Sequence, residues 1–312
     1  MTRKHIIFLV LLLTACAHAH APLPLPDPFV IVLGIAQDGG YPQAGCRRAD
    51  CIAAFHDPSL RRHVASLGIV DPESGERWII DSTPDFPAQL QALDEAAPTA
   101  TMPGLTGIAL THAHIGHYTG LMHLGREVLG THAVPVYAMP RMLGFLEHNG
   151  PWSQLVSLEN ISLRPLQDAV PVQLNARITL TPLIVPHRDE YSETVGFVVA
   201  GPHTSILWLP DIDKWEKWPK GLESVLAGVS IAYVDGTFYD ASELPGRDLG
   251  EIPHPLMVET MSRLEVAARS SAAKIRFIHL NQSNPALRDE RVRRMIRARG
   301  FEVASEGERK PL

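Results

Sequence analysis

Three histidines, His112, His114 and His117, stand within six residues directly after the apolar run at residues 105–111. Alternate residues of a strand share one face, so His112 and His114 can point toward the same ion as the chain leaves a strand. His117 then begins a turn into a helix and would face a second position nearby. Neutral imidazole is a good zinc ligand, and three nitrogens plus water make an open catalytic site. The chain must therefore fold so that a strand ends at this cluster.

Apolar runs of strand length recur along the chain and are interrupted by segments with helical spacing. We expect strands at residues 29–36, 64–70, 78–81, 105–111, 134–137, 158–166, 172–174, 178–185, 195–199, 205–209, 231–235 and 274–279. We expect helices at residues 84–97, 119–129, 255–268 and 286–297. Strand-rich blocks closed by helices, twice over, predict an α/β fold with two sheets packed face to face and helices outside. No linker divides residues 29–312, which we interpret as a single domain.

Further residues with metal-binding side chains follow other apolar runs, at the strand ends where open α/β sheets present ligands. They are His187, Asp211 and His279. With the histidine cluster, this order resembles the His-x-His-x-Asp-His signature and the later ligands of the metallo-β-lactamase superfamily, and it implies an αββα sandwich. The resemblance implies a first metal site formed by His112, His114 and His187. It also implies a second site formed by His117 and His279, with Asp211 as the carboxylate that bridges the two sites. It also implies that Asp211 and His279 are catalytic.

Four other motifs resemble one branch of that superfamily, the pyrroloquinoline quinone synthesis protein B branch, which is implicated in making a redox cofactor. They are Gly39–Gln43 followed by Cys46 and Cys51, Asp81–Asp85, Tyr233–Phe238 and His279–Pro285. The branch carries a Cys-x-Cys-x-x-Cys zinc clip, whereas here Arg48 takes the middle position. Its members are generally cytoplasmic and often have a degraded first ligand motif, which is intact here. The chain thus resembles an exported paralogue with hydrolase-type ligands.

Gly116 stands where the superfamily signature has an aspartate. The second site then lacks one carboxylate, so we expect one tight metal and a second, weaker one. In the alternative, Asp38 or Asp85 supplies the missing carboxylate from a neighbouring loop. Asp81, at a strand end, is expected to orient a ligand histidine. The histidines that match no ligand position are interpreted as structural, namely His56, His63, His123, His132, His148, His203 and His254.

The N-terminal segment is typical of an export signal. Two basic residues and an apolar block at Ile6–Leu13 precede Leu-Thr-Ala-Cys, which resembles the bacterial lipoprotein box. We therefore expect a signal peptide at residues 1–15, lipidation of Cys16 and a proline-rich tether at residues 16–28. Ala17 follows the cysteine, which resembles lipoproteins that are sent to the outer membrane, so we expect the chain at the periplasmic face of that membrane. The alternative is ordinary cleavage further on, after Ala19 or Ala21.

Export also bears on the two remaining cysteines, because a disulfide between Cys46 and Cys51 is the default in an oxidising compartment. A metal clip would need three or four ligands, and only Arg47–Asp50 lies between the two cysteines.

The chain has 28 Lys and Arg residues against 34 Asp and Glu residues, a net charge of −6. Phosphate backbones need clustered positive charge, so we do not expect a nucleic-acid partner.

The leading hypothesis is a zinc-dependent hydrolase that uses a metal-activated hydroxide on an ester, lactone, amide or phosphoester bond of a small molecule. Iron or manganese is an alternative to zinc. A second hypothesis is an iron-dependent redox or cofactor-maturation protein resembling the quinone-synthesis branch. A third is a metal-binding lipoprotein without turnover. The substrate itself is left open, because one fold supports many reactions.

The anchor is tested by replacing Cys16 with serine. Cys16 is the only candidate for lipidation, so the variant should incorporate no labelled palmitate and should leave the membrane fraction or accumulate as precursor. Cells that express the wild-type chain are labelled in parallel. If the wild type also incorporates no palmitate, the chain is not a lipoprotein.

Overall fold

Alternate side chains of the first strand, β1 (Phe29–Gly34), enter two different cores. Val30 and Val32 are buried in the larger core, between two sheets, whereas Ile31 and Leu33 belong to a second core beneath outer helices. This is the period of two that a strand imposes on its side chains. Burial of both faces explains why the run is apolar throughout.

Two seven-stranded sheets form the centre of the computed structural model, which describes residues 26–270 and 274–312. The first sheet has the order β14-β1-β2-β3-β4-β5-β6, and its other strands are β2 (Ser66–Asp71), β3 (Glu76–Ile80), β4 (Gly107–Ala109), β5 (Val134–Ala138), β6 (Ile161–Pro165) and β14 (Arg309–Pro311). The second has the order β13-β12-β11-β10-β9-β8-β7, with β7 (Val172–Gln173), β8 (Thr179–Ile184), β9 (Val195–Ala200), β10 (Ser205–Leu209), β11 (Ile231–Asp235), β12 (Lys274–Ile278) and β13 (Glu302–Val303).

The two sheets are built alike, with antiparallel pairs on one side and parallel pairs on the other. In the first sheet β14, β1, β2 and β3 pair antiparallel and β3 to β6 pair parallel. In the second sheet β7 to β10 pair antiparallel and β10 to β13 pair parallel. The parallel strands of each sheet therefore present their carboxyl ends at one edge.

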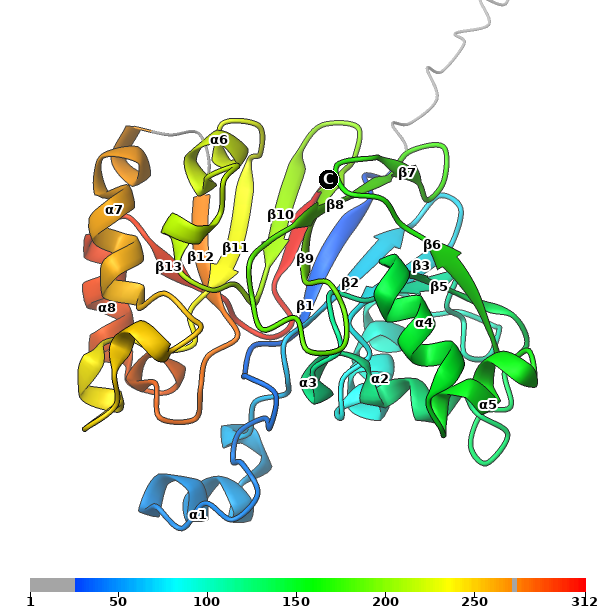
Figure 1. The fold of residues 1–312 in the computed structure, drawn as a ribbon, viewed down its shortest axis with the longest axis horizontal. Coiled ribbons are helices and arrows are strands. Elements are labelled where there is room, and N and C mark those ends of the chain that lie inside the picture. The colour runs from blue at the N-terminus through cyan, green and yellow to red at the C-terminus, as the bar shows by residue number, and fades with distance from the viewer. Residues whose placement is uncertain (1–25, 271–273) are drawn as a thin grey trace, which may run out of the picture.

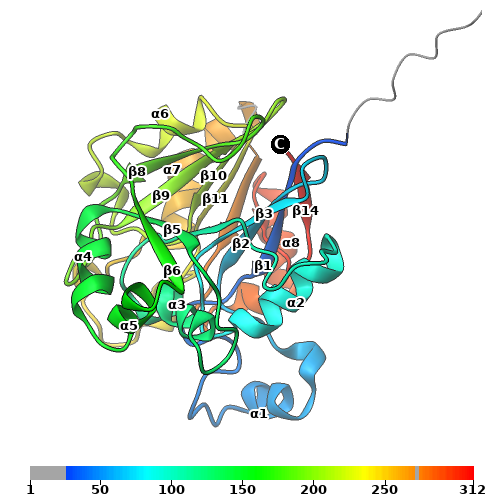
Figure 2. The same cartoon turned by 90° about the vertical axis from the view of Figure 1, so that its right-hand side faces the viewer.

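Helices cover the outer faces of both sheets. The α-helices of the described structure are α1 (Ala49–His56), α2 (Phe86–Ala96), α3 (Ile115–Tyr118), α4 (Pro140–His148), α5 (Trp152–Ser157), α6 (Leu222–Leu226), α7 (Met257–Ser270) and α8 (Glu290–Ala298). Figures 1 and 2 show α2, α4 and α5 beside the first sheet, α6, α7 and α8 beside the second, and α1 projecting from the body. This is the αββα sandwich, in a single domain, that the sequence predicts.

One predicted element is wrong. The helix expected at residues 119–129 is absent from the described structure, where the short α3 is followed by a 3-10 helix at Thr119–Leu124. Glycines explain the difference. The helical segment ends at Gly125, whose ψ of 167° is extended, and Gly130 adopts a positive φ of 54°.

Some predictions concern segments beyond the described structure. The signal peptide at residues 1–15, the lipidated Cys16 and the tether up to residue 25 lie outside the described residues. Within residues 26–270 and 274–312, no helix combines the length and the apolar character that crossing a membrane requires. The C-terminus lies on the upper side in Figure 1, where the Leu312 amide donates to the Pro28 carbonyl at 2.8 Å, and α1 and α3 lie on the lower side.

Candidate metal centre

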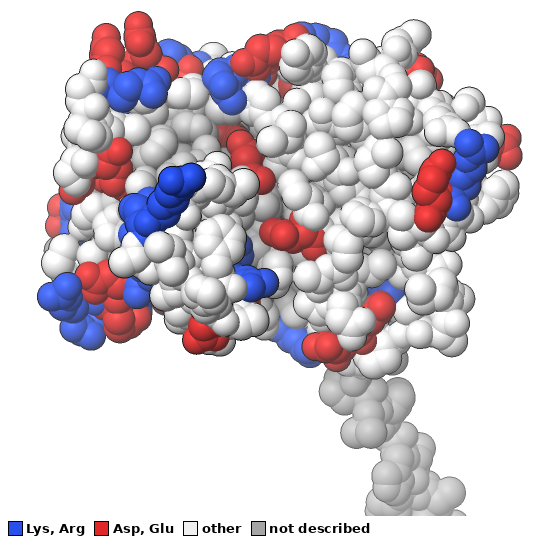
Figure 3. All heavy atoms as spheres, turned by 90° about the horizontal axis from the view of Figure 1, so that it is seen from below, with Lys and Arg blue, Asp and Glu red and all other residues white. Residues whose placement is uncertain are grey.

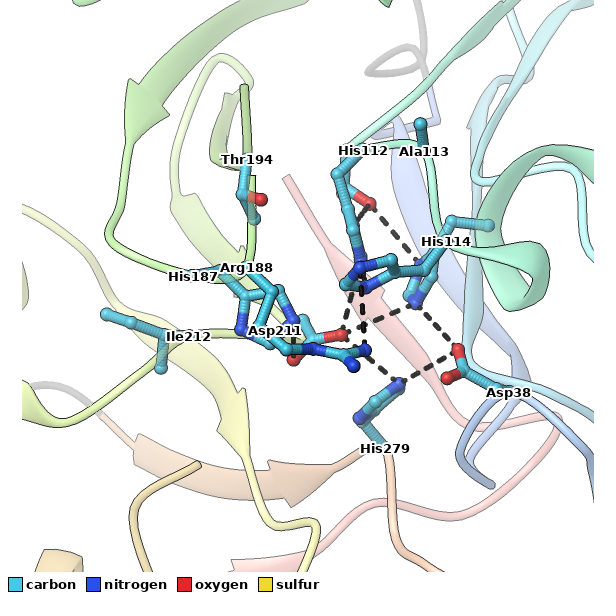
Figure 4. A network of polar contacts seen from close by, with 12 residues as sticks. Asp38, His112, Ala113, His114, His187, Arg188, Thr194, Asp211, Ile212 and His279 are labelled. Carbon is cyan, nitrogen blue, oxygen red and sulfur yellow. Dashed lines mark hydrogen bonds and ion pairs between the residues drawn. The ribbon is translucent and has the colours of Figure 1, made fainter. Parts of the chain in front are cut away.

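Four side chains from three strand ends form a first group of candidate ligands. They are His112, His114, His187 and Asp211, whose ligand atoms all lie within 4.8 Å of one another. His112 Nε2 is 2.8 Å from His114 Nδ1 and 3.4 Å from Asp211 Oδ2. His187 Nε2 is 3.2 Å from Asp211 Oδ1. The structure thus brings together the residues that the sequence assigned to the first site, as Figure 4 shows.

A second group consists of Asp38, His117 and His279. The Oδ1 atom of Asp38 lies 3.3 Å from His117 Nε2 and 3.8 Å from His279 Nε2. Asp211 Oδ2 is 3.7 Å from each of these two nitrogens. Because Asp211 contacts both groups, it occupies the place expected of a bridging carboxylate (Figure 4).

The second group contains a carboxylate, which corrects the expectation that Gly116 leaves it one short. A Cβ at Gly116 would lie 2.2 Å from Asp38 Oδ1, so the Asp38 carboxylate occupies the space that a side chain at position 116 would need. Asp85, the other alternative, lies elsewhere, because its Oδ2 accepts a hydrogen bond from the Val64 amide at 2.8 Å. Asp38 therefore takes the place of the missing aspartate.

The loop that carries Asp38 is fastened to the loop that follows His279. The Gln37 amide donates to the Leu280 carbonyl at 2.9 Å, and the Asn281 side-chain amide donates to the Gln37 side chain. Further along, a disulfide joins Cys46 to Cys51, and Arg48 donates to the Gln282 carbonyl at 2.7 Å. These contacts hold the two chain segments side by side and place Asp38 opposite His279.

Outer hydrogen bonds orient the imidazoles of both groups. His117 Nδ1 is 2.8 Å from Asp81 Oδ2, and Asp81 also accepts from the Thr111 amide at 2.8 Å. His114 Nε2 is 3.1 Å from Glu190 Oε2. The sequence assigned such an orienting contact to Asp81 but not to Glu190. A contact of this kind fixes the ring so that its other nitrogen faces the centre.

Backbone strain accompanies this arrangement. Asp81 has a φ of 66° and His279 a φ of 65°, in the left-handed region that non-glycine residues seldom adopt. Asp81 directly follows β3 and contacts His117. His279 directly follows β12 and belongs to the second group. Strain of this kind persists only where the surroundings hold it, and it is concentrated at functional sites.

Several atoms at the centre are buried without a hydrogen bond to any residue in the described parts of the chain. They are Asp38 Oδ1, His117 Nε2, His187 Nε2, Asp211 Oδ1 and His279 Nε2. Buried polar atoms are almost always paired, and an unpaired one costs free energy. All five belong to the two groups, so a cation at each group would satisfy them. Imidazole nitrogens with carboxylate oxygens suit zinc and other transition metals.

The electrostatic surroundings keep the first group ready to bind a cation. Burial lowers the pKa of His112 well below its usual value and lowers the pKa of His187 to about 4, so both rings are neutral near pH 7. Burial alone would raise the pKa of Asp211, but the neighbouring His187, His279 and His254 hold it well below its usual value. Neutral imidazoles beside an ionised carboxylate are the protonation states that metal binding requires.

His254 belongs to this centre although the sequence analysis treated it as structural. It is buried, and its Nδ1 lies 2.8 Å from Asp235 Oδ2 and 3.2 Å from Asp211 Oδ1. Asp211, His254 and His279 form a third group of potential ligands. His254 stands in an irregular segment before α7, so no strand end pointed to it. The one available signal was its partner Asp235, which ends β11 within the Tyr233–Phe238 motif.

Comparisons with known proteins agree with this geometry. A family model described as beta-lactamase superfamily domain matches residues 76–280. Coenzyme PQQ synthesis protein B of Pseudomonas fluorescens (strain SBW25) is 29% identical over 314 residues, which cover 89% of this chain and 98% of that protein. The protein of the same name from Xanthomonas oryzae pv. oryzae (strain MAFF 311018) is 26% identical over 303 residues, with the same coverage of 89% and 98%.

Two solved structures share the fold. Zinc-bound PqqB from Methylobacterium extorquens superposes with a TM-score of 0.75 at 22% identity, over 91% of this chain and 100% of that one. A diphosphatase from the PhnP family superposes with a TM-score of 0.67, also at 22% identity, over 93% of this chain and 98% of that one.

The placement of Asp38 predicts how the second metal responds to mutation. Asp38→Asn should lower the affinity for the second metal equivalent by about 10- to 100-fold and leave the first unchanged, since Asp38 belongs only to the second group. Chelator titration with metal analysis by plasma mass spectrometry measures both equivalents.

The double variant Asp38→Gly with Gly116→Asp is the matched control, because it moves the carboxylate to the position of the superfamily signature. It should recover the second equivalent, whereas Gly116→Asp alone should not improve binding, because its side chain would meet Asp38. If Asp38→Asn keeps two metals as tightly as the wild type, Asp38 is not a ligand.

Proposed function

Because the chain belongs to the beta-lactamase superfamily, we propose that it is a metal-dependent hydrolase acting on an ester, lactone, amide or phosphoester bond of a small molecule. The observation that carries this proposal is the set of buried, inward-facing atoms without hydrogen bonds to described residues. A protein that used these side chains only for packing would satisfy them with hydrogen bonds, whereas here they meet only at ion-pair distances of 3.2 to 3.8 Å. Their convergence from both sheets on two positions is what a two-metal hydrolytic site requires.

The residues of the centre have different roles in this proposed reaction. A zinc ion held by these residues would supply a water acidified toward neutral pH and a Lewis acid for the oxygen that gains charge in the reaction. Asp211 links the two groups, because its two oxygens contact different histidines. Asp38 adds negative charge to the second group, and Asp81 holds the His117 ring in place. Iron or manganese would be held by the same donors.

The proposal extends to where the protein acts. A lipid anchor at Cys16, reached through the proline-rich segment, would hold the domain at the periplasmic face of the outer membrane. The chain enters the domain beside the C-terminus, because the Leu312 amide donates to the Pro28 carbonyl. Figure 1 shows the C-terminus on the opposite side of the molecule from α3, which carries His117. An anchored domain would therefore present its metal centre away from the membrane, toward small molecules in the periplasm.

Hydrolysis is tested with zinc-loaded protein and a panel of chromogenic substrates: 4-nitrophenyl acetate, nitrocefin, bis(4-nitrophenyl) phosphate and a lactone followed with a pH indicator. His187→Ala removes a buried ligand and should lower kcat/KM by at least about 100-fold, more than the loss of an outer contact does. His132→Ala is the control, since His132 is exposed and belongs to none of the groups. Equal rates in the wild type and His187→Ala would contradict the proposal, as would the lack of turnover of every substrate.

A second candidate function has its own support. The similarity to Coenzyme PQQ synthesis protein B spans 98% of that protein, which favours an iron-dependent redox or cofactor-maturation activity. The hydrolase is preferred because the carboxylate missing at position 116 is replaced by Asp38, so the second group keeps a full set of donors. Metal analysis of protein from its native host separates the two functions. Bound zinc without oxygen uptake supports the hydrolase, and bound iron with oxygen uptake supports the redox protein.

A further inference from the structure

Arg188 lies beside the metal centre but belongs to none of its groups. It directly follows His187, and its Nη2 atom is 3.5 Å from His114 Nε2. Its side chain is 53% exposed, so it lies at the surface beside the centre rather than inside it. Figure 4 shows it among the candidate ligands. A cation at this position lies within reach of any molecule that approaches the first group.

The loop that carries Arg188, residues 185–194, is fixed at several points. At its start the Asp213 amide donates to the Pro186 carbonyl at 2.7 Å. In its second half the Ala113 amide donates to Ser192 Oγ at 2.8 Å, and Thr194 Oγ1 donates to Asp189 Oδ1 at 2.9 Å. Because Ala113 lies between two candidate ligands, the loop is tied to the ligand motif itself. Arg188 is therefore positioned by an anchored segment.

The charge of Arg188 is only loosely compensated. Its carboxylate contact in the described structure is Glu190, at 3.9 Å, and Glu190 itself lies 3.1 Å from His114 Nε2. By contrast, the buried Arg77 has a carboxylate at 2.7 Å, on Asp94. Guanidinium donors without a close partner form a planar fork that matches the two oxygens of a carboxylate or phosphate group.

Two exposed apolar side chains stand on the segments that carry Arg188 and His114. Tyr191 is 62% exposed, and its ring lies 5.5 Å from that of Phe145. Ile115, which follows His114, is also 62% exposed. On the face seen from below, positive and negative side chains are interspersed (Figure 3). On such a mixed face, an anion is attracted by individual cations rather than by a field of one sign.

We propose that Arg188 is a specificity-determining residue that binds a carboxylate or phosphate group of the substrate beside the bond to be cleaved. The substrate class is accordingly a small anionic molecule with an apolar part that packs on Tyr191 and Ile115. This inference rests on the proposed hydrolase function. Beyond the metal ligands of that function, the inference assigns to Arg188 the selection of the substrate.

The test compares two esters with the same leaving group, the neutral 4-nitrophenyl acetate and the anionic mono-4-nitrophenyl succinate. Arg188→Gln should lower kcat/KM for the anionic ester roughly 10-fold or more, mainly through KM, because it removes a charge-assisted hydrogen bond. The neutral ester should change less than about 2-fold, because the ligands are untouched. Arg188→Lys should recover part of the loss. Arg126→Gln, which removes an exposed charge paired with Glu127, is the matched control.

A binding measurement makes the test independent of turnover. Calorimetry at constant ionic strength gives the affinity of the zinc-loaded proteins for inorganic phosphate and for monomethyl succinate, and metal analysis checks that all variants hold equal zinc. Arg188→Gln should weaken at least one anion by about 10-fold, and the anion affected identifies the group that is recognised. If both esters lose activity equally, or if neither anion binds more weakly, the inference is overturned. If no ester is hydrolysed but Arg188→Gln still weakens anion binding, the proposed hydrolase fails and the anion site stands.

Discussion

The buried carboxylate of Asp211 is the constraint on which the rest of the structure depends. Its Oδ2 lies 3.4 Å from His112 and 3.7 Å from both His117 and His279, while its Oδ1 lies 3.2 Å from both His187 and His254. A charge that is only 2% exposed is stable only if other groups compensate it. His112 and His117 come from the first sheet and His187 and His279 from the second, so the αββα sandwich is what closes this shell around one carboxylate.

The second group has its carboxylate on Asp38 rather than at position 116, so its geometry depends on a different part of the chain. An aspartate within the histidine motif would be placed by the motif itself, whereas Asp38 is placed by a loop after β1 that must reach across to Leu280 and Gln282. The second group therefore depends on the contacts and the disulfide that hold this loop. The first group is built on strand ends in the core. The two groups should differ in how far distant loop contacts affect them.

Much of this could be predicted because it is local. Apolar runs marked the strands, and the histidine motif with its later ligands resembled a superfamily whose fold and donor order then followed. What could not be predicted is long-range. His254 stands in an irregular segment, and only folding brings it to Asp211. Asp38 could be named only as one of two alternatives, because folding alone places it beside His117 and His279. The helix expected at 119–129 was wrong because its apolar spacing outweighed the glycines within it, and the chain leaves the helical conformation at Gly125.

The central claim is that this chain holds two metal ions on either side of Asp211, with Asp38 as a ligand of the second. Diffraction from zinc-soaked crystals, collected on both sides of the zinc absorption edge, locates each ion directly. We expect two anomalous peaks about 3.5–4 Å apart, with an Asp38 oxygen about 2.0–2.2 Å from the ion beside His279. A single peak at the first group, or a second ion that Asp38 does not contact, would contradict the account.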